Sequence, residues 1–478
     1  MMPEQAEGSS LRQRAHGILG GAALLASAQI VSRMFTMVFT LVIARLMSVA
    51  DFGAMNLALS MVVVFALIQD LGISRTVVKE IARRPEGASQ WIGRLLPVKL
   101  LLAGVAAVMM PALAALSGYD ASMVVLLVVA ACMLPTASVW LLLENATQAV
   151  GAVHVLAGVT VTNAVLQTTI GLAAVLGGGG DPRLLVAAMG TANLISTVVL
   201  WLQLVRRVGP IRLGFNLLFS RQTITASLPY LAVAIAVAAL GRVELILLAR
   251  LAGDEAAGVF AAAFKIFEAA LFVLYAVQIA MNPTLALLVV GDRPNLERWL
   301  DWEFGALAAS IVPVAVCGAL LAGPLISLLY PPGYEAAGGV LVVLIVGLPI
   351  VGLQVFTAGV LMLTDRRRAV LLLNVTVLAA QVTLSSLLIP HYGALGAAVA
   401  LACSQGLAAI LGLALIAGRL AGRQAFARSS RMLVASLVAL AAGWAARAAA
   451  GDLAGMATAV LVLVCCLPFA KVRLLPPH

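Results

Sequence analysis

Continuous apolar runs of close to twenty residues recur along the whole chain, separated by short polar stretches. A run of about twenty apolar residues is long enough for a helix to cross a bilayer. Strands of a membrane barrel would instead alternate polar and apolar positions over about ten residues, and lipid tolerates no other spanning structure. We therefore predict an all-α polytopic membrane protein of about fourteen spans. The predicted spans lie near 17–44, 52–71, 92–116, 121–143, 154–178, 184–205, 224–249, 258–281, 303–330, 337–362, 369–389, 394–418, 432–450 and 453–470.

The composition supports lipid as the solvent of this chain. Hydrophobic residues make up 63% of it, charged residues only 10%, and the mean hydropathy is +1.09. Soluble domains are about a quarter charged. The net charge of +10 does not indicate a nucleic-acid partner, because the basic residues form short clusters between apolar runs.

The basic clusters also predict an orientation. If the N-terminus is inside, most of the 30 Lys and Arg residues fall on the inside connections, as is typical of cytoplasmic loops. We expect a protein of the bacterial inner (cytoplasmic) membrane with both termini cytoplasmic. The predicted outside connections are all short, which argues against a membrane enzyme of polysaccharide assembly, because such an enzyme needs a large outer loop to hold the sugar acceptor.

An internal repeat divides the chain. Residues 44–53 recur as 249–258, each beginning Ala-Arg-Leu and ending in Gly. Each copy joins the first and second span of a six-span group, so the two groups have the same orientation, as parallel repeats that enclose a central cavity do. The predicted regions are a cytoplasmic tail 1–16, an N-lobe 17–210, a cytoplasmic inter-lobe linker 211–222, a C-lobe 223–418, and a final region 419–478 with spans thirteen and fourteen and a cytoplasmic tail.

Several short motifs resemble those of a known family. In chain order they are Ala44-Arg45-Leu46 with Asp51-Phe52-Gly53, Gln69-Asp70-Leu71-Gly72-Ile73, Arg242-Val243-Glu244, 258–268, Asn282-Pro283, 330–336 and 392–398. Together they resemble the bacterial polysaccharide and O-antigen flippases (the oligosaccharide flippase family) of the multidrug/oligosaccharidyl-lipid/polysaccharide exporter superfamily. Glu244 stands where the family has Asp, and Phe260 where it has Tyr.

The resemblance implies both an architecture and a function. Two pseudo-symmetric six-helix lobes would surround a central cavity, with two extra C-terminal helices at the periphery. By alternating access the chain would flip an undecaprenyl-pyrophosphate-linked oligosaccharide, such as an O-antigen, capsule or exopolysaccharide repeat unit, from the inner to the outer leaflet. Its expected partners are this glycan, membrane lipids, a coupling H⁺ or Na⁺, and the polysaccharide polymerase with its chain-length machinery.

Cations inside apolar runs are the first candidate site residues, because a mid-membrane charge normally faces a cavity or a partner. Arg33 lies about 18 Å inside its predicted span, taking 1.5 Å per residue. We predict that Arg33, Arg242 and Lys265 line the central cavity and attract the pyrophosphate, which a guanidinium binds in pairs of hydrogen bonds. The alternatives are snorkelling to the interface and a structural ion pair.

Carboxylates near these cations are the second set of candidates. Lys265 and Glu268 are three residues apart on one helix and can pair, whereas Arg242 and Glu244, two apart, must find separate partners. Glu244 and Glu268 are predicted to neutralise an Arg or to bind the coupling ion.

A third set lies at the inner end of the second span. Asp70 is predicted to pair there with Arg75 or Lys79 as an inner gate, or else to cap the helix at the interface. No cofactor or metal is expected, because the five cysteines and four histidines form no ligand cluster.

Other functions are weighed against this one. A lipid II flippase of peptidoglycan synthesis shares fourteen spans and cationic cavity residues. A multidrug/cation antiporter of the same superfamily would normally have twelve spans and a less basic cavity. A structural scaffold is disfavoured by the buried cations.

Overall fold

The computed structural model describes residues 3–70, 83–214, 240–288, 293–363 and 367–417, together with residues 73, 78, 80 and 81. The chain divides into two compact units, Met1–Ala238 (the N-terminal unit) and Ala239–His478 (the C-terminal unit), which are treated separately below. Predicted spans 432–450 and 453–470, and residues 224–239 of the seventh predicted span, lie outside the described residues. The total of fourteen spans therefore stays a prediction.

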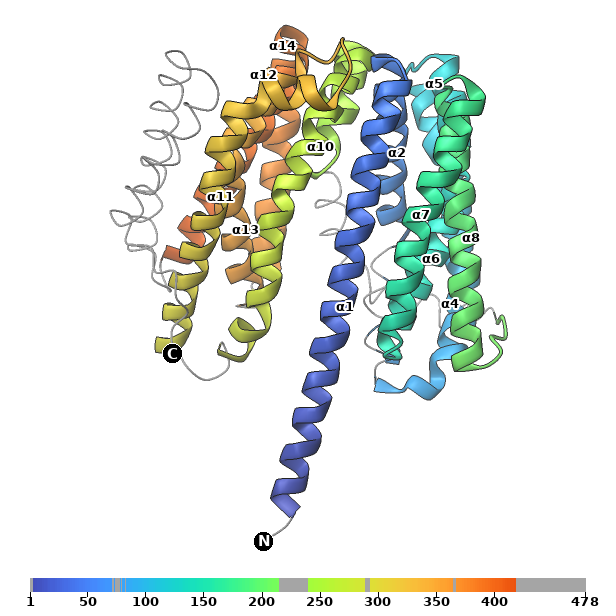
Figure 1. The fold of residues 1–478 in the computed structure, drawn as a ribbon, viewed down its shortest axis with the longest axis vertical. Helices are drawn as coiled ribbons and strands as arrows, with labels where there is room; N and C mark the ends of the chain where they lie inside the picture. Colours follow the sequence, from blue (N-terminus) through green and yellow to red (C-terminus); the bar gives the residue numbers. More distant parts are fainter. Residues whose placement is uncertain are drawn as a thin grey trace. The chain divides into compact units, whose positions relative to one another are not determined.

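The N-terminal unit is built from long helices that run alongside one another (Figure 1). They are α1 (Pro3–Leu46), α2 (Val49–Asp70), η1 (Pro85–Gly87), α4 (Ala88–Leu116), α5 (Ala121–Ala131), α6 (Met133–Ala149), α7 (Val153–Gly178) and α8 (Pro182–Val208). Helices α5 and α6 continue each other as one candidate span, Ala121–Ala149.

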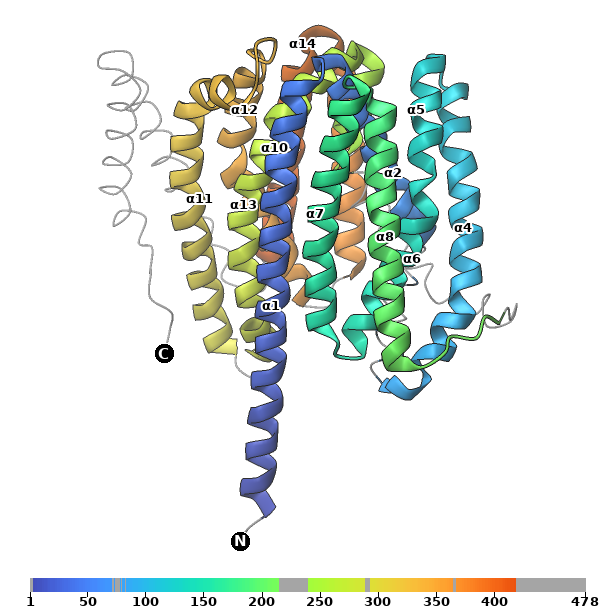
Figure 2. The ribbon, with the colours of Figure 1, turned by 45° about the vertical axis from the view of Figure 1, so that its right-hand side comes forward.

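The described helices of the C-terminal unit pack around α10 and α14 (Figure 2). They are α10 (Val243–Leu288), α11 (Arg293–Leu329), α12 (Ala337–Val346), α13 (Leu348–Leu363) and α14 (Arg367–Ala417). Helices α12 and α13 together form one candidate span, Ala337–Leu361.

Two of these elements each contain a chain reversal at a glycine. In α10 the reversal is at Gly253, with φ 87°, and in α14 it is at Gly393, with φ 54°. A straight helix would separate Arg242 from Glu268 by about 39 Å, yet the two side chains form an ion pair. In α14, a Cβ on Gly396 would lie 2.5 Å from the carbonyl oxygen of Leu388, eight residues earlier. Both elements are therefore helical hairpins, and glycine accepts the positive φ that each turn requires.

Ten helical segments of the described chain are long and apolar enough to cross a membrane, which confirms the prediction of a multi-pass helical membrane protein. In the N-terminal unit, five of the predicted spans match observed ones to within several residues. They are Val49–Asp70, Ala88–Leu116, Ala121–Ala149, Val153–Gly178 and Pro182–Val208. The first candidate span is Leu24–Leu46, and α1 continues N-terminally from it as a helix to Pro3, through most of the predicted tail.

Local sequence explains where several helices begin. The side chain of Asp120 accepts hydrogen bonds from the backbone of Ser122 and Met123 at the start of α5. Asp181 does the same for Arg183 at the start of α8, where Pro182 occupies the first helical position. Such caps satisfy backbone N–H groups that the first helical turn leaves without partners.

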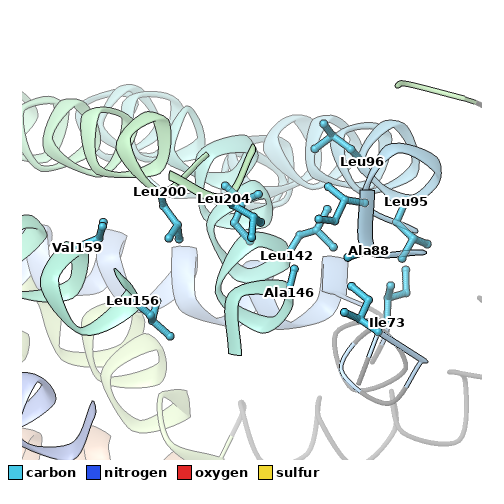
Figure 3. Close-up of a cluster of buried hydrophobic side chains, with 13 residues drawn as sticks. Ile73, Ala88, Leu95, Leu96, Leu142, Ala146, Leu156, Val159, Leu200 and Leu204 are labelled. Atoms are coloured by element: carbon cyan, nitrogen blue, oxygen red, sulfur yellow. The ribbon is translucent and has the colours of Figure 1, made fainter. Parts of the chain in front are cut away.

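The helices of the N-terminal unit bury one apolar core and expose apolar faces. Figure 3 shows side chains of α4, α6 and α8 converging; among the core residues are Leu95, Leu142, Leu200 and Leu204, each at most 1% exposed. On α4 the opposite face carries exposed aliphatic side chains, including Val108, 70% exposed. An outward face of this kind suits lipid, whereas Lys99 of α4 is buried on the inward side.

Candidate functional site

A group of three charged side chains lies across the α10 hairpin; we call it the C-terminal charge cluster. Glu268 accepts a hydrogen bond from Lys265 Nζ at 3.0 Å through Oε2, and its Oε1 lies 3.6 Å from Arg242 Nη2. Each of the three side chains is 28–29% exposed. The cluster contains two cations and one carboxylate and so carries a formal charge of +1. Hydrogen bonds to charged groups of this kind are the stronger ones in proteins.

The α10 hairpin explains how the cluster forms. The turn at Gly253 lies eleven residues after Arg242 and fifteen before Glu268, so the two arms bring these positions to comparable heights. The pairing of Lys265 with Glu268 was expected from their spacing and is present. The pairing of Arg242 with Glu268 was not foreseen, because it requires knowledge of the reversal.

Glu244 has a different environment from Glu268. Arg242 pairs with Glu268. Glu244 is only 3% exposed, and its Oε1 is buried without a hydrogen-bond partner among the described residues. Its predicted role in ion pairing or coupling stays a prediction.

A second charged site, which we call the N-terminal pair, lies inside the N-terminal unit. Lys99 Nζ of α4 donates to Asp70 Oδ1 of α2 at 2.5 Å. Lys99 is 0% exposed and Asp70 8%. Lys99 is eleven residues into α4, about 16 Å from its start at 1.5 Å per residue, whereas Asp70 is the last residue of α2.

Two further hydrogen bonds surround the N-terminal pair. Gln69 Nε2 of α2 donates to the carbonyl of Leu134 in α6 at 3.2 Å, and Ser138 Oγ of α6 donates to the carbonyl of Lys99 at 3.3 Å. Polar contacts therefore join α2, α4 and α6 at one level. These three helices also pack against one another along their apolar faces.

The structure adds a partner of Asp70 that the sequence did not indicate. The sequence predicted a partner among Arg75 and Lys79, or a capping role at the interface; Arg75 and Lys79 lie outside the described residues, so both roles stay predictions. Asp70 is buried and pairs with Lys99. This pair was not foreseen, because Lys99 is 29 residues away, on another helix.

Arg33, the remaining predicted cation, lies on α1 with an exposed side chain. Helix α1 packs mainly on α7, where the ring of Phe39 fills the space that a side chain at Gly171 would need. A cavity shared by Arg33, Arg242 and Lys265 stays a prediction.

Sequence reasoning overlooked two buried charged residues. Lys99 is a single cation in the middle of an apolar run, which was itself a signal. Glu303 of α11 is 3% exposed. It is the first residue of its predicted span, where a charged residue is common and does not indicate burial. Among the described residues, no group of three or more His, Cys, Asp or Glu side chains could hold a metal ion.

Comparison with protein families gives one match. A family model described as "Polysaccharide biosynthesis protein" matches residues 18–289, more than half of the chain. No curated protein sequence matches the chain significantly.

Solved structures show the same fold. The structure of "Lipid II flippase MurJ, inward closed conformation" matches with a TM-score of 0.74 and 11% sequence identity, over 94% of this chain and 98% of that one. An inward-facing multidrug resistance MATE family transporter of the MOP superfamily matches with a TM-score of 0.62 and 16% identity, over 86% and 98%. A MOP superfamily transporter from Pyrococcus furiosus matches with a TM-score of 0.57 and 17% identity, over 86% and 94%.

These comparisons agree on one fold. The chain has the fold of the MOP superfamily transporters over most of its length. Together with the family match, this fold confirms the resemblance that the sequence motifs indicated.

Proposed function

Because the chain belongs to the polysaccharide biosynthesis protein family, we propose that it flips an undecaprenyl-pyrophosphate-linked oligosaccharide from the inner to the outer leaflet of the bacterial cytoplasmic membrane. Alternating access between two six-span lobes would carry the glycan through, while the lipid tail stays in the bilayer. In this proposal the lobes are residues 17–210 and 223–418, joined by the linker 211–222, and both termini are cytoplasmic.

One observation supports a substrate linked to pyrophosphate: the C-terminal charge cluster has two cations and one carboxylate. Glu268 neutralises only one of Arg242 and Lys265, and the side chains are more than a quarter exposed. A diphosphate offers several anionic oxygens to such a cluster, and a guanidinium binds phosphate oxygens in pairs. Arg33, also exposed, supplies a further cation in the proposed cavity.

The test is export of surface polysaccharide. In a deletion strain complemented with Arg33→Ala plus Arg242→Ala, we expect loss of surface glycan and accumulation of carrier-linked repeat units inside, with the protein still present in the membrane. The double variant Arg183→Ala plus Arg250→Ala removes two other arginines, one half-buried and one exposed, and is the matched control, which should export normally. Retained export by the first variant at equal protein level would contradict the proposal.

A second variant separates charge from geometry. Arg33→Lys plus Arg242→Lys keeps both charges but loses the planar fork. We expect partial export, because an ammonium still attracts phosphate as a point charge. Full loss in this variant would mean that paired hydrogen bonds, and not charge alone, are required.

A lipid II flippase is the second candidate, favoured by the fold likeness to a protein of that description. Lipid II carries the same pyrophosphate, so the charge cluster suits both substrates. The family match favours the polysaccharide substrate. Two results together would favour lipid II as the substrate. The chain would rescue a strain depleted of its lipid II flippase, and deletion of the chain from its own host would leave surface polysaccharide unchanged.

A further inference from the structure

Helices α7 and α8 bring basic side chains together at one end of the N-terminal unit. Arg207 Nη2, in the last turn of α8, lies 2.6 Å from Nε2 of His154, at the start of α7. A guanidinium has no acceptor, so Nε2 accepts this hydrogen bond and the imidazole carries its hydrogen on Nδ1. The Nδ1–H and the other guanidinium N–H groups therefore remain to donate to a further acceptor.

No carboxylate of the described residues neutralises this group, which we call the basic end (Arg206, Arg207 and His154). All three side chains are exposed, and none of them forms an ion pair with another described residue. Arg212, also exposed, follows on the segment after α8. Phosphate oxygens accept hydrogen bonds from guanidinium groups in pairs, so adjacent arginines and a histidine without an acid suit a phosphate.

An exposed aliphatic stripe on α8 leads to the basic end. Ile195, Val198 and Leu202 precede Arg206 by eleven, eight and four residues, a spacing that places all four on one helix face. The three aliphatic side chains are 40–52% exposed. The described chain thus leaves apolar surface uncovered along α8 up to the point where the charge begins.

Helix α7 carries a matching exposed stripe beside it. His154, Gly158 and Val165 are exposed and share one face by their spacing. Helices α7 and α8 pack together (Figure 2) and are antiparallel, so the contact of His154 with Arg207 places Gly158 and Leu202 at similar depth, about 6–8 Å from the basic end. Nothing lies within 4 Å of a Cβ built on Gly158, which leaves open space at this depth.

We propose that the basic end and the two stripes form a binding site for an anionic phospholipid. The headgroup phosphate accepts hydrogen bonds from the three side chains of the basic end, and one acyl chain lies along Leu202 and Gly158. A soluble phosphate would contact the charges alone. Both stripes belong to helices long and apolar enough to cross a membrane, so membrane lipid has access to them. The site uses no residue of the C-terminal charge cluster and goes beyond the proposed function.

Native mass spectrometry of the full chain in detergent, titrated with lipid, tests the proposal. Each arginine near a membrane surface strengthens attraction to anionic lipid about fivefold. The first lipid bound by the wild type should therefore show a preference of about tenfold or more for phosphatidylglycerol over phosphatidylcholine with the same acyl chains. Arg206→Gln plus Arg207→Gln should abolish this preference. The control Arg45→Gln plus Arg250→Gln removes two exposed arginines at corresponding positions of the repeat and should keep it.

Three outcomes of the titration would overturn the proposal. They are the absence of a preference in the wild type, its survival in Arg206→Gln plus Arg207→Gln, and its loss in the control. Two competitors identify the source of the phosphate. Neither inorganic phosphate nor undecaprenyl phosphate, at the concentration of the phospholipid, should displace phosphatidylglycerol; displacement would assign the site to a free anion or to the carrier lipid and would also overturn the proposal.

Amide hydrogen exchange of the wild type locates the site without any variant. In phosphatidylcholine nanodiscs with added phosphatidylglycerol, peptides from 150–158 and 203–214 should exchange about threefold more slowly or less than without it. Peptides from 45–53, around the control position Arg45, should not change. Equal exchange of 150–158 and 203–214 in both lipids would refute the site. Since no measurement involves a glycan, failure of this site and failure of the proposed substrate are separate results.

Discussion

The N-terminal pair and the C-terminal charge cluster use the same chemistry in two different ways. In the first, one ammonium meets one carboxylate, and Lys99 has no exposed surface. In the second, two cations share one carboxylate and all three side chains remain more than a quarter exposed. A buried ion pair between two helices suits the holding of those helices, because its charges are satisfied within the protein. An open cluster with spare positive charge suits an anionic ligand.

The largest effect should come from breaking the closed pair on one side. Lys99→Met removes one partner of a buried ion pair, which should cost about 3–5 kcal/mol of stability. Thermal unfolding of the purified protein in detergent measures the loss, and membrane levels should fall with it. Arg94→Met, an exposed cation on the same helix, is the control and should have little effect.

The neutral pair variant sharpens this first prediction. Replacing both partners, Asp70→Asn plus Lys99→Met, should recover most of the lost stability, because apolar and neutral replacements of a buried ion pair are often tolerated. A double variant no more stable than Lys99→Met alone would show that the interaction between the two residues is not what stabilises this part of the N-terminal unit.

Loss of its carboxylate should not impair the C-terminal charge cluster, in contrast to loss of one partner of the N-terminal pair. Glu268→Gln raises the formal charge from +1 to +2, so export should be retained, whereas Arg242→Gln plus Lys265→Gln should reduce it about tenfold or more. Surface polysaccharide at matched protein level is the measurement. Loss of export in Glu268→Gln with the protein folded would mean that the cluster acts as an ion pair and not as an anion site.

The two copies of the repeat allow a smaller, conformational test. At the same repeat position, Ser48 caps α2 by accepting a hydrogen bond from the Asp51 backbone at 3.1 Å, whereas Gly253 turns the chain with φ 87°. Ser48→Ala should cost about 1 kcal/mol through loss of the cap. Gly253→Ala should cost about 1–2 kcal/mol through the positive φ alone, since nothing lies within 4 Å of the new Cβ. Thermal unfolding compares the two, and Gly104→Ala, a helical position with open space around its Cβ, should not destabilise.

The smallest effect concerns a loop outside the spans. Hydrogen bonds from the backbone N–H of Glu335 itself and from that of Gly333, at 2.9 Å, hold the pKa of Glu335 below its usual value. A lowered pKa in the folded state means that the stabilisation is present at neutral pH and is lost as pH falls through the folded pKa. Hydrogen exchange of the 330–336 loop should therefore rise below about pH 4, and Glu335→Gln should remove the acid dependence.

Features fixed by local pattern could be predicted from the sequence. Apolar runs located the five spans from Val49 to Val208 to within several residues. The separate spans 369–389 and 394–418 anticipated the break at Gly393. A three-residue spacing was enough for the pair of Lys265 with Glu268.

Features that depend on tertiary packing could not be predicted in the same way. The partner of Asp70 lies 29 residues away, and that of Arg242 lies 26 residues away across a hairpin. Nothing in the local sequence tells a buried carboxylate which helix will supply its cation.

The reversal at Gly393 has a topological consequence. A helix continued through residues 369–416 would be about 72 Å long, more than twice the thickness of the hydrocarbon layer. Because the backbone doubles back there, the chain leaves α14 on the same face of the bilayer at which it entered. This one glycine therefore decides whether the number of membrane crossings up to residue 417 is even or odd. The side of the membrane on which the chain continues after residue 417 depends on it. The shared basic character of Arg366–Arg368 and Arg419–Arg431 agrees with a common compartment for the two ends of this hairpin.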